Sequence, residues 1–255
     1  MILPRIIPTL LLYDEGIVKT KSFKNPVYLG DPINAVRIFN EKEVDELVIA
    51  DIAVTKNGGD PNFNWIEEIV SEAFMPIGYA GGISNLDNIK KLFNLGIEKV
   101  ILNSFSFDYD LITEAAKIYG NQSIVVCIDA KKTIFGNYKI HTHAGQQKQS
   151  TELLIHVKKI VEAGAGEIII QSIDKEGTMS GYDLTLTRNV ADSVDVPIVA
   201  LGGASCLKDM KVVIKHGGAS AAAAGSIFVF KSKERGVLIN YPSKTEIANL
   251  FKNEK

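Results

Sequence analysis

Short apolar segments recur along the chain and alternate with longer amphipathic ones. Short apolar runs, most of them rich in Val, Ile or Leu, predict strands at residues 6–12, 47–52, 76–79, 100–103, 124–129, 168–173, 197–201 and 221–226. Between most of them, apolar residues recur at helical spacing, for example at 88–95, 111–119, 152–163 and 207–216. Alternation of this kind favours a parallel sheet whose strands are joined through helices.

The sequence also repeats at half its length. Residues 75–107 align with residues 196–228 at a constant offset of 121 positions, and the match includes a Gly-Gly pair in each copy. Eight parallel strands with twofold sequence symmetry predict a (β/α)8 TIM barrel, built from two tandem half-barrels as a single domain over residues 1–255. An open doubly wound sheet is the alternative, but it offers no reason for a repeat at half length.

Composition narrows the possible partners. The 28 basic and 30 acidic residues give a formal charge of −2, which leaves no basic field for nucleic acid or an anionic membrane surface. No apolar run reaches the roughly 18 to 20 residues of a membrane span, and the first apolar segment is interrupted by Pro4, Arg5 and Pro8. We expect a cytoplasmic protein in which Cys127 and Cys206 are buried, reduced thiols.

Each half ends with two candidate phosphate signals, a Gly-Gly after its third strand and a small polar turn after its fourth. Glycine lets backbone N–H groups approach a phosphate, and hydroxyl or amide side chains donate to its other oxygens. Tight turns are the alternative for a single pair, but two symmetric pairs favour a ligand with a phosphate at each end. The signals are Gly81-Gly82 with Asn103-Ser104, and Gly202-Gly203 with Gly225-Ser226.

Carboxylates at strand ends are the candidates for acid–base chemistry. Asp51, Asp129 and Asp174 each follow an apolar run. Asp129 comes after the very apolar residues 124–128, so burial should raise the pKa of its carboxyl into a useful range; a loop-capping role is the alternative. Lys19, after the first strand, can close over an anionic ligand or remain an exposed loop lysine.

The histidines raise the question of a metal. His141 and His143 alternate, so a strand would present both on one face. A polar hairpin is favoured over a zinc site because no third ligand lies nearby, and no metal or other cofactor is expected. His156 and His216 are predicted to be surface residues of helices, and Trp65 a packing anchor.

Several short motifs resemble the cyclase subunit of imidazole glycerol phosphate synthase. They include Arg5-Ile-Ile, Gly30-Asp-Pro, Gly81-Gly-Ile, Ile128-Asp-Ala-Lys and Gly181-Tyr-Asp, and the resemblance extends over nearly the whole chain. In that family the barrel receives ammonia from a partner glutaminase. It uses the ammonia to close the imidazole ring of a substrate carrying two phosphates.

The resemblance implies roles for individual residues. A charged gate at the ammonia entrance would be formed by Arg5, Glu46, Lys99 and Glu167, although a stabilising salt-bridge ring is the alternative for such residues. Glu98 falls at a contact to the glutaminase, and Lys19 falls at the family's flexible first-loop lysine. The phosphate residues would be Gly82, Asn103 and Ser104 at one end, and Gly203, Gly225 and Ser226 at the other.

One catalytic position departs from the family. Leu11 stands where the family has its first catalytic aspartate, whereas the second is retained as Asp129. Gln171 and Glu176 also differ, standing where the family has threonine and aspartate. Glu176, Lys19, Asp51 and Asp174 are expected at the substrate mouth, and losing a general acid typically slows a reaction by about 10²- to 10⁴-fold.

These departures resemble a second, cyclase-like paralogue found beside surface-polysaccharide genes. In that group, the barrel and a glutaminase-like partner are thought to supply ammonia to a sugar amidotransferase. Our leading hypothesis is therefore an ammonia-supplying barrel subunit that binds a glutaminase at its N-terminal face. One alternative is an active cyclase that uses Asp14 or Asp51 as a substitute acid, and another is a non-catalytic scaffold that binds a bisphosphorylated metabolite.

Overall fold

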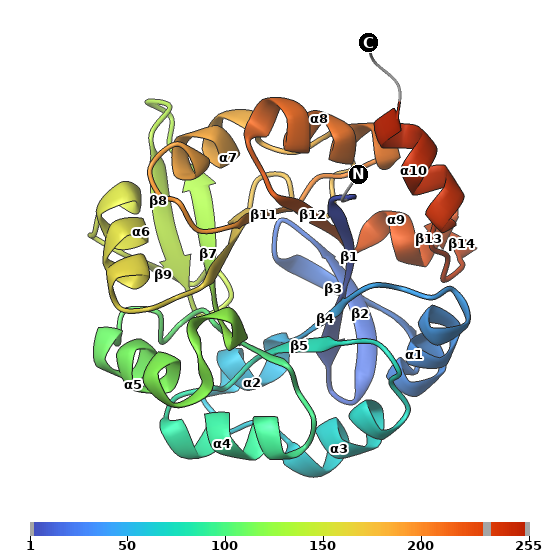
Figure 1. Cartoon of the computed structure of the whole chain (residues 1–255), viewed down its shortest axis with the longest axis horizontal. Coiled ribbons are helices and arrows are strands. Elements are labelled where there is room, and N and C mark those ends of the chain that lie inside the picture. Colours follow the sequence, from blue (N-terminus) through green and yellow to red (C-terminus); the bar gives the residue numbers. More distant parts are fainter. Residues whose placement is uncertain (1–2, 232–235, 253–255) are drawn as a thin grey trace.

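Eight parallel strands form a closed ring in the computed structural model, which describes residues 3–231 and 236–252 (Figure 1). β12 pairs with β1 and so closes the ring. The (β/α)8 prediction is therefore confirmed, and the doubly wound alternative is wrong. The ring follows the order β1 (Arg5–Tyr13), β4 (Leu47–Asp51), β5 (Ile77–Ala80), β6 (Lys99–Leu102), β7 (Ile124–Lys132), β10 (Glu167–Ser172), β11 (Ile198–Leu201) and β12 (Ala221–Ala224).

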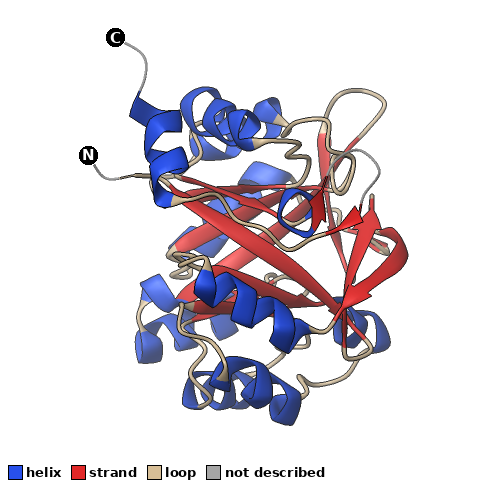
Figure 2. Ribbon diagram, turned by 90° about the vertical axis from the view of Figure 1, so that its right-hand side faces the viewer, coloured by secondary structure: helices blue, strands red, loops and turns tan. Residues whose placement is uncertain are grey.

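Helices cover the outside of the ring (Figure 2). Several begin at an Asp or Asn whose side chain accepts a backbone N–H of the first turn, as Asn85 does from Asn88. None of the helices in the described ranges is long and apolar enough to cross a membrane. They are α1 (Pro32–Glu41), α2 (Ile52–Asn57), α3 (Phe63–Ser71), α4 (Leu86–Asn94), α5 (Tyr109–Tyr119), α6 (Leu153–Glu162), α7 (Leu184–Ala191), α8 (Leu207–Gly217), α9 (Ser226–Val229) and α10 (Lys244–Lys252).

The core has two layers, because side chains alternate across each strand. In β1, Ile6, Leu10 and Leu12 pack outward among the helices, whereas Ile7 belongs to a separate cluster inside the ring. The inner cluster is apolar throughout and includes the small side chains of β12. Its buried members are Ile7, Val48, Ile101, Val125, Cys127, Ile169, Val199, Ala221 and Ala223.

The first strand of each half runs on into an antiparallel extension at the C-terminal end of the ring. β1 continues into β2 (Gly16–Lys21) and β3 (Lys24–Gly30), and β7 continues into β8 (Tyr138–Thr142) and β9 (Gln147–Lys148). The β1–β2 turn places Asp14 and Glu15 at φ 46° and 61°, as two-residue hairpin turns require. The segment after the first strand, predicted as a loop, is therefore a hairpin.

Short elements complete the chain. The 3-10 turn η1 (Asn121–Ser123) precedes β7, and β13 (Phe230–Lys231) pairs with β14 (Gly236–Val237). The hydroxyl of Tyr241 donates to the carbonyl of Ile6 at 2.8 Å and so ties the C-terminal segment to β1.

Two predictions of burial were wrong. Cys206 is exposed at the start of α8, whereas Cys127 is buried as expected. His156 is fully buried between α5 and α6, where its ring stacks on Phe107 at a centroid distance of 4.0 Å. Burial lowers the pKa of His156 to about 4. His216 is exposed and Trp65 packs against the core, as predicted.

Candidate functional site

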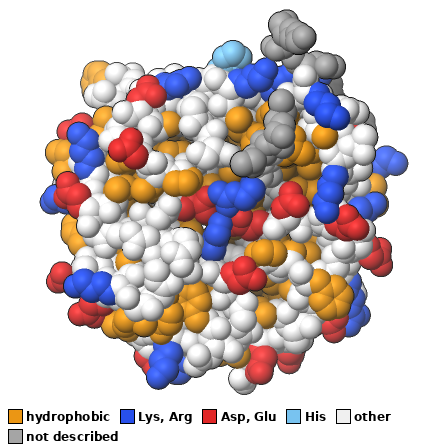
Figure 3. All heavy atoms as spheres, in the orientation of Figure 1, with side chains coloured by type: hydrophobic (Ala, Val, Ile, Leu, Met, Phe, Trp, Pro, Cys, Tyr) orange, Lys and Arg blue, Asp and Glu red, His pale blue; other side chains and the backbone are white. Residues whose placement is uncertain are grey.

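Four charged side chains close a ring across the N-terminal end of the barrel. Arg5 donates to Glu46 at 2.5 Å and to Glu167, and Lys99 contacts the same two carboxylates at 2.8 Å each. Each cation thus touches both anions, so the four residues carry no net charge together. Figure 3 looks onto this end and shows acidic and basic side chains gathered at its centre.

The electrostatics of this ring favour the ionised forms of Glu167 and Arg5. Burial opposes ionisation of Glu167, yet hydrogen bonds and charge from Arg5 and Lys99 hold the pKa of its carboxyl below the ordinary value. Burial also opposes the charge of Arg5, but Glu167 and Glu46 raise the pKa of its guanidinium. Glu98 lies exposed beside Lys99 on the same face.

The opposite end of the axis opens into an apolar cavity of about 110 Å³. Leu11 lines this cavity and is 8% exposed. Its polar lining includes Asp129 of β7 and Asn103 in the turn after β6. A leucine at this position cannot exchange a proton, and the carboxylates that line this cavity are those of Asp129 and Asp51.

Asp129 lies in an environment that favours its protonated form. The Asn103 amide donates to its carboxylate at 3.1 Å, and the Cys127 thiol lies 3.9 Å away. Burial raises the pKa of Asp129 to about 7, assisted by the charge of Glu176 and opposed by the Asn103 hydrogen bond. A carboxyl of this pKa can donate or accept a proton near neutral pH.

The Gly-Gly and polar turn of the first half border an open cavity of about 300 Å³. Gly81 and Gly82 adopt φ 136° and 65°, and a Cβ on Gly82 would lie 2.4 Å from Val54. Only glycine fits this turn. We call this the first-half cavity, and its lining includes Gly58, Gly59, Asp60, Gly82, Ser84, Asn103, Ser104 and His143.

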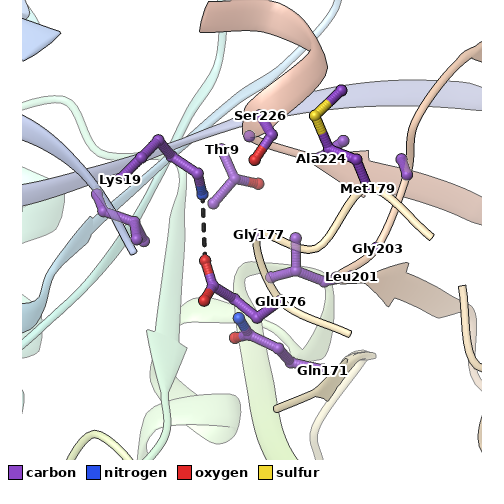
Figure 4. A pocket seen from close by; sticks show the side chains of 14 residues that line it. Thr9, Lys19, Gln171, Glu176, Gly177, Met179, Leu201, Gly203, Ala224 and Ser226 are labelled. Carbon is purple, nitrogen blue, oxygen red and sulfur yellow. Dashed lines mark hydrogen bonds and ion pairs between the residues drawn. The ribbon is translucent and has the colours of Figure 1, made fainter. Parts of the chain in front are cut away.

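The matching cavity of the second half measures only about 30 Å³. Gly203, Gly225 and Ser226 line it as expected, together with Thr9, Leu11, Lys19 and Glu176. Lys19 and Glu176 point toward each other across it and pair at 3.4 Å (Figure 4). We call this the second-half cavity. Lys19 is a buried residue of β2, so the prediction of an exposed or loop lysine was wrong.

The other candidate acids are Asp51 and Asp14, and neither is placed like Asp129. Asp51 lines the same apolar cavity as Leu11 and Asp129, but its carboxylate caps α2 by accepting the backbone N–H groups of Ala53 and Val54 at 3.0 and 3.2 Å. Burial raises the pKa of Asp51, although these hydrogen bonds oppose the rise. Asp14 lies in the exposed β1–β2 turn.

Asp174 was placed wrongly at the mouth. Its side chain is exposed, and it accepts the backbone N–H of Lys132 at 2.8 Å. It borders a separate surface hollow beside the β7–β8 hairpin.

His143 was not predicted to belong to a ligand site. β8 ends at Thr142, and His143 adopts φ 53° in the following turn, so it does not share a strand face with His141. Its backbone N–H donates to the Ser104 hydroxyl at 3.0 Å, its ring Nδ1 lies 3.2 Å from the Thr142 hydroxyl, and the residue lines the first-half cavity. The equivalent position of β1 and β7 in the internal repeat could have indicated that both hairpins reach the mouth.

Fold and site together define a TIM-barrel protein of a biosynthetic family. A family model described as "Histidine biosynthesis protein" matches residues 5–234, and the chain belongs to that family. Within it, this chain is a cyclase-like subunit of the HisF kind, as the resemblance implied.

Relatives match the chain over almost its full length. It is 44% identical over 253 residues to a Leptospira borgpetersenii protein provisionally named imidazole glycerol phosphate synthase subunit HisF, covering 98% of this chain and 100% of that one. Proteins provisionally named subunits hisF2 of Pseudomonas aeruginosa and hisF3 of Vibrio vulnificus are 44% and 45% identical over 248 residues. These alignments cover 97% and 96% of this chain, and 99% and 95% of the relatives.

Proposed function

We propose that this chain is the barrel subunit of a glutamine-dependent ammonia-supply complex. It receives ammonia from a HisH-like glutaminase at its N-terminal face and supplies it to a sugar amidotransferase, which amidates a nucleotide-activated sugar for surface polysaccharide such as lipopolysaccharide O-antigen. The observation that carries the proposal is the pairing of an intact charged ring with Leu11 in the mouth.

The charged ring supports ammonia entry. Its four residues close the axis at one end and leave an apolar interior behind them. Neutral ammonia can enter such an interior, whereas ammonium would lose its hydration without compensation. Displacing Lys99 or Arg5 from the shared carboxylates would open the ring, and a partner bound over Glu98 and its neighbours is well placed to do so.

The mouth supports delivery rather than ring closure. Cyclisation in the family relies on two carboxylates, and here Leu11 leaves Asp129 without the first. The candidate substitutes are an exposed turn residue, Asp14, and a helix cap, Asp51. Ammonia that reaches this mouth can therefore leave the barrel. It meets only one of the two carboxylates that cyclisation in the family relies on.

The first test reconstitutes ammonia transfer. The chain is mixed with the glutaminase-like partner and the sugar amidotransferase, and glutamine-dependent amidation is compared with amidation driven by ammonium salt. We expect amidation from glutamine to require this chain and amidation from ammonium salt not to require it. We also expect the partner's glutaminase activity to rise when the chain is added. Equal glutamine-dependent amidation without the chain would refute the proposal.

The second test asks whether the barrel is a cyclase. Turnover of the family's bisphosphorylated formimino-ribulosyl substrate is measured with excess ammonium for the natural chain and for Leu11→Asp. We expect activity to be at least about 10²-fold higher in the variant, in line with the usual contribution of a general acid. Comparable turnover by the natural chain would instead favour an active cyclase of histidine biosynthesis.

A binding scaffold is the second candidate, and the open first-half cavity favours it. Under this hypothesis the chain binds a phosphorylated metabolite and leaves the glutaminase unaffected. Calorimetry that shows ligand binding, together with a glutaminase rate that does not change when this chain is added, would favour the scaffold over ammonia supply.

A further inference from the structure

The antiparallel extensions cross the mouth, so that each half of the barrel contributes a side chain to the other half's cavity. β2 belongs to the first half and carries Lys19 into the second-half cavity. The β8–β9 turn belongs to the second half and carries His143 to the first-half cavity. Lys19 and His143 thus reach opposite cavities from the two hairpins.

The second-half cavity is filled by the protein itself. Its volume of about 30 Å³ accommodates about two water molecules, which is too little for the four oxygens of a phosphate. The Lys19 ammonium lies against Gly225, where an added Cβ would be 2.6 Å from Nζ. The hairpin is held there by Ser22 and Phe23, whose N–H groups donate to the backbone and carboxylate of Glu176 at 2.9 and 3.1 Å.

Glu176 also opposes an anion electrostatically. Its carboxylate is 3% exposed and lines the same cavity, so a phosphate beside it would face a negative charge in surroundings that screen poorly. The family's aspartate at this position is one methylene shorter than glutamate. The longer side chain reaches Lys19, and the pair satisfies both charges without a ligand.

The first-half cavity has the opposite character. Its volume of about 300 Å³ is sufficient for a phosphate group. Ser104 and His143 border it from two different elements, and the His143 N–H to Ser104 bond of 3.0 Å fixes the turn over the cavity. A histidine ring can donate an N–H in either protonation state. Asp60 also lines the cavity, but it is exposed, so solvent screens its charge, and its carboxylate accepts from Asn88 at 3.4 Å.

We infer that the mouth binds a ligand carrying a single phosphate, held in the first-half cavity by Ser104, the Gly82 turn and His143. The Lys19–Glu176 pair excludes a second phosphate from the second-half cavity. His143 is thus a phosphate-binding residue contributed by the opposite half, and Glu176 determines specificity for phosphate monoesters over bisphosphates. This inference concerns binding alone and does not depend on ammonia transfer.

Calorimetry on the full chain tests the inference with defined probes. Inorganic phosphate, fructose 6-phosphate and fructose 1,6-bisphosphate are titrated into the natural protein. We expect one inorganic phosphate per chain, and an affinity for the bisphosphate within about threefold of that for the monophosphate. Two phosphates per chain, or a bisphosphate bound more than tenfold more tightly, would overturn the inference.

Variants assign the two residues. Removing a hydrogen bond to a charged ligand typically costs about 1.5–3 kcal/mol, so His143→Ala should weaken inorganic phosphate binding by at least about tenfold. His216→Gln, on the exposed face of α8, is the matched control and should bind like the natural chain. An unchanged affinity in His143→Ala would exclude His143 from the site.

Glu176→Gln should remove the negative charge that opposes an anion in the second-half cavity. We expect a second inorganic phosphate per chain, or at least a tenfold gain for the bisphosphate over the monophosphate, with the fold checked by circular dichroism. A folded variant that still binds one phosphate and shows no bisphosphate preference would contradict the role of Glu176. If this variant fails to fold, the stoichiometry of the natural chain decides the matter alone.

Discussion

The two halves of the barrel share one backbone plan but retain different parts of the family's site. The first half has an open phosphate cavity, yet its first strand carries Leu11 in place of an acid. The second half retains Asp129 on its first strand, yet its phosphate cavity is filled by Lys19 and Glu176. Symmetry of the fold therefore does not ensure symmetry of chemistry, because side chains at a few mouth positions decide what each half binds.

The largest effect should come from unpairing the second-half cavity. Lys19→Met would leave the Glu176 carboxylate buried without its cation, and breaking a buried pair in this way typically destabilises by about 3–5 kcal/mol. Guanidinium unfolding would measure the change. Lys91→Met is the matched control, because it removes an exposed pair with Asp87 and should have little effect. A small loss for Lys19→Met would mean that the second-half cavity is hydrated rather than closed.

The next effect is a dependence of stability on pH, caused by Asp129, which has no acidic counterpart on β1. Its carboxyl has a pKa of about 7 when folded and about 3.9 when unfolded. The folded state therefore binds more protons between these values, so stability is lost as pH rises from about 4 to 7, by up to about 4 kcal/mol. Asp129→Asn should remove this slope in unfolding curves measured at pH 4.5, 6 and 8. An identical slope in the variant would show that other groups cause it.

A smaller loss of stability, equal for the two halves, is expected at the charged ring, where the halves have not diverged. Glu46 and Glu167 correspond in the repeat and occupy equivalent places in the charged ring. Because Arg5 and Lys99 remain partly exposed, at 33% and 21%, Glu46→Gln and Glu167→Gln should each cost about 1–2 kcal/mol. Thermal unfolding of both variants would test this. Unequal losses of stability in the two variants would show that the halves also differ at the N-terminal end of the barrel.

The smallest effect lies at the wall of the first-half cavity. Asp51→Ala removes the cap of α2, whose residue Val54 lines that cavity, and lost caps typically cost about 1 kcal/mol. Asp51→Asn preserves the capping oxygen and serves as the control. If Asp51→Ala also abolished cyclase turnover that the natural chain possessed, Asp51 would be a catalytic acid rather than a cap.

The sequence predicted the ring of strands because strand and helix periodicities are local properties, and the repeat made closure the natural solution. It also predicted that Arg5 and Glu167 would meet, through the family resemblance. It did not predict the burial of Lys19 or His156, because both depend on packing between elements distant in sequence: β2 on the loop after β10, and α5 on α6. Asp174 was misplaced because one position along a strand end reverses the direction of a side chain.

The β2–β3 hairpin introduces an edge into a sheet that otherwise has none. Ring closure leaves each barrel strand paired on both sides, whereas β3 pairs only with β2 in the described part of the chain, and exposes Val27 and Tyr28. Such an edge is a template for pairing with other chains. Pro26 removes one donor from β3, and irregular register along β2 twists the ribbon. The hairpin that carries Lys19 into the second-half cavity thus also carries features that oppose pairing of its edge with another chain.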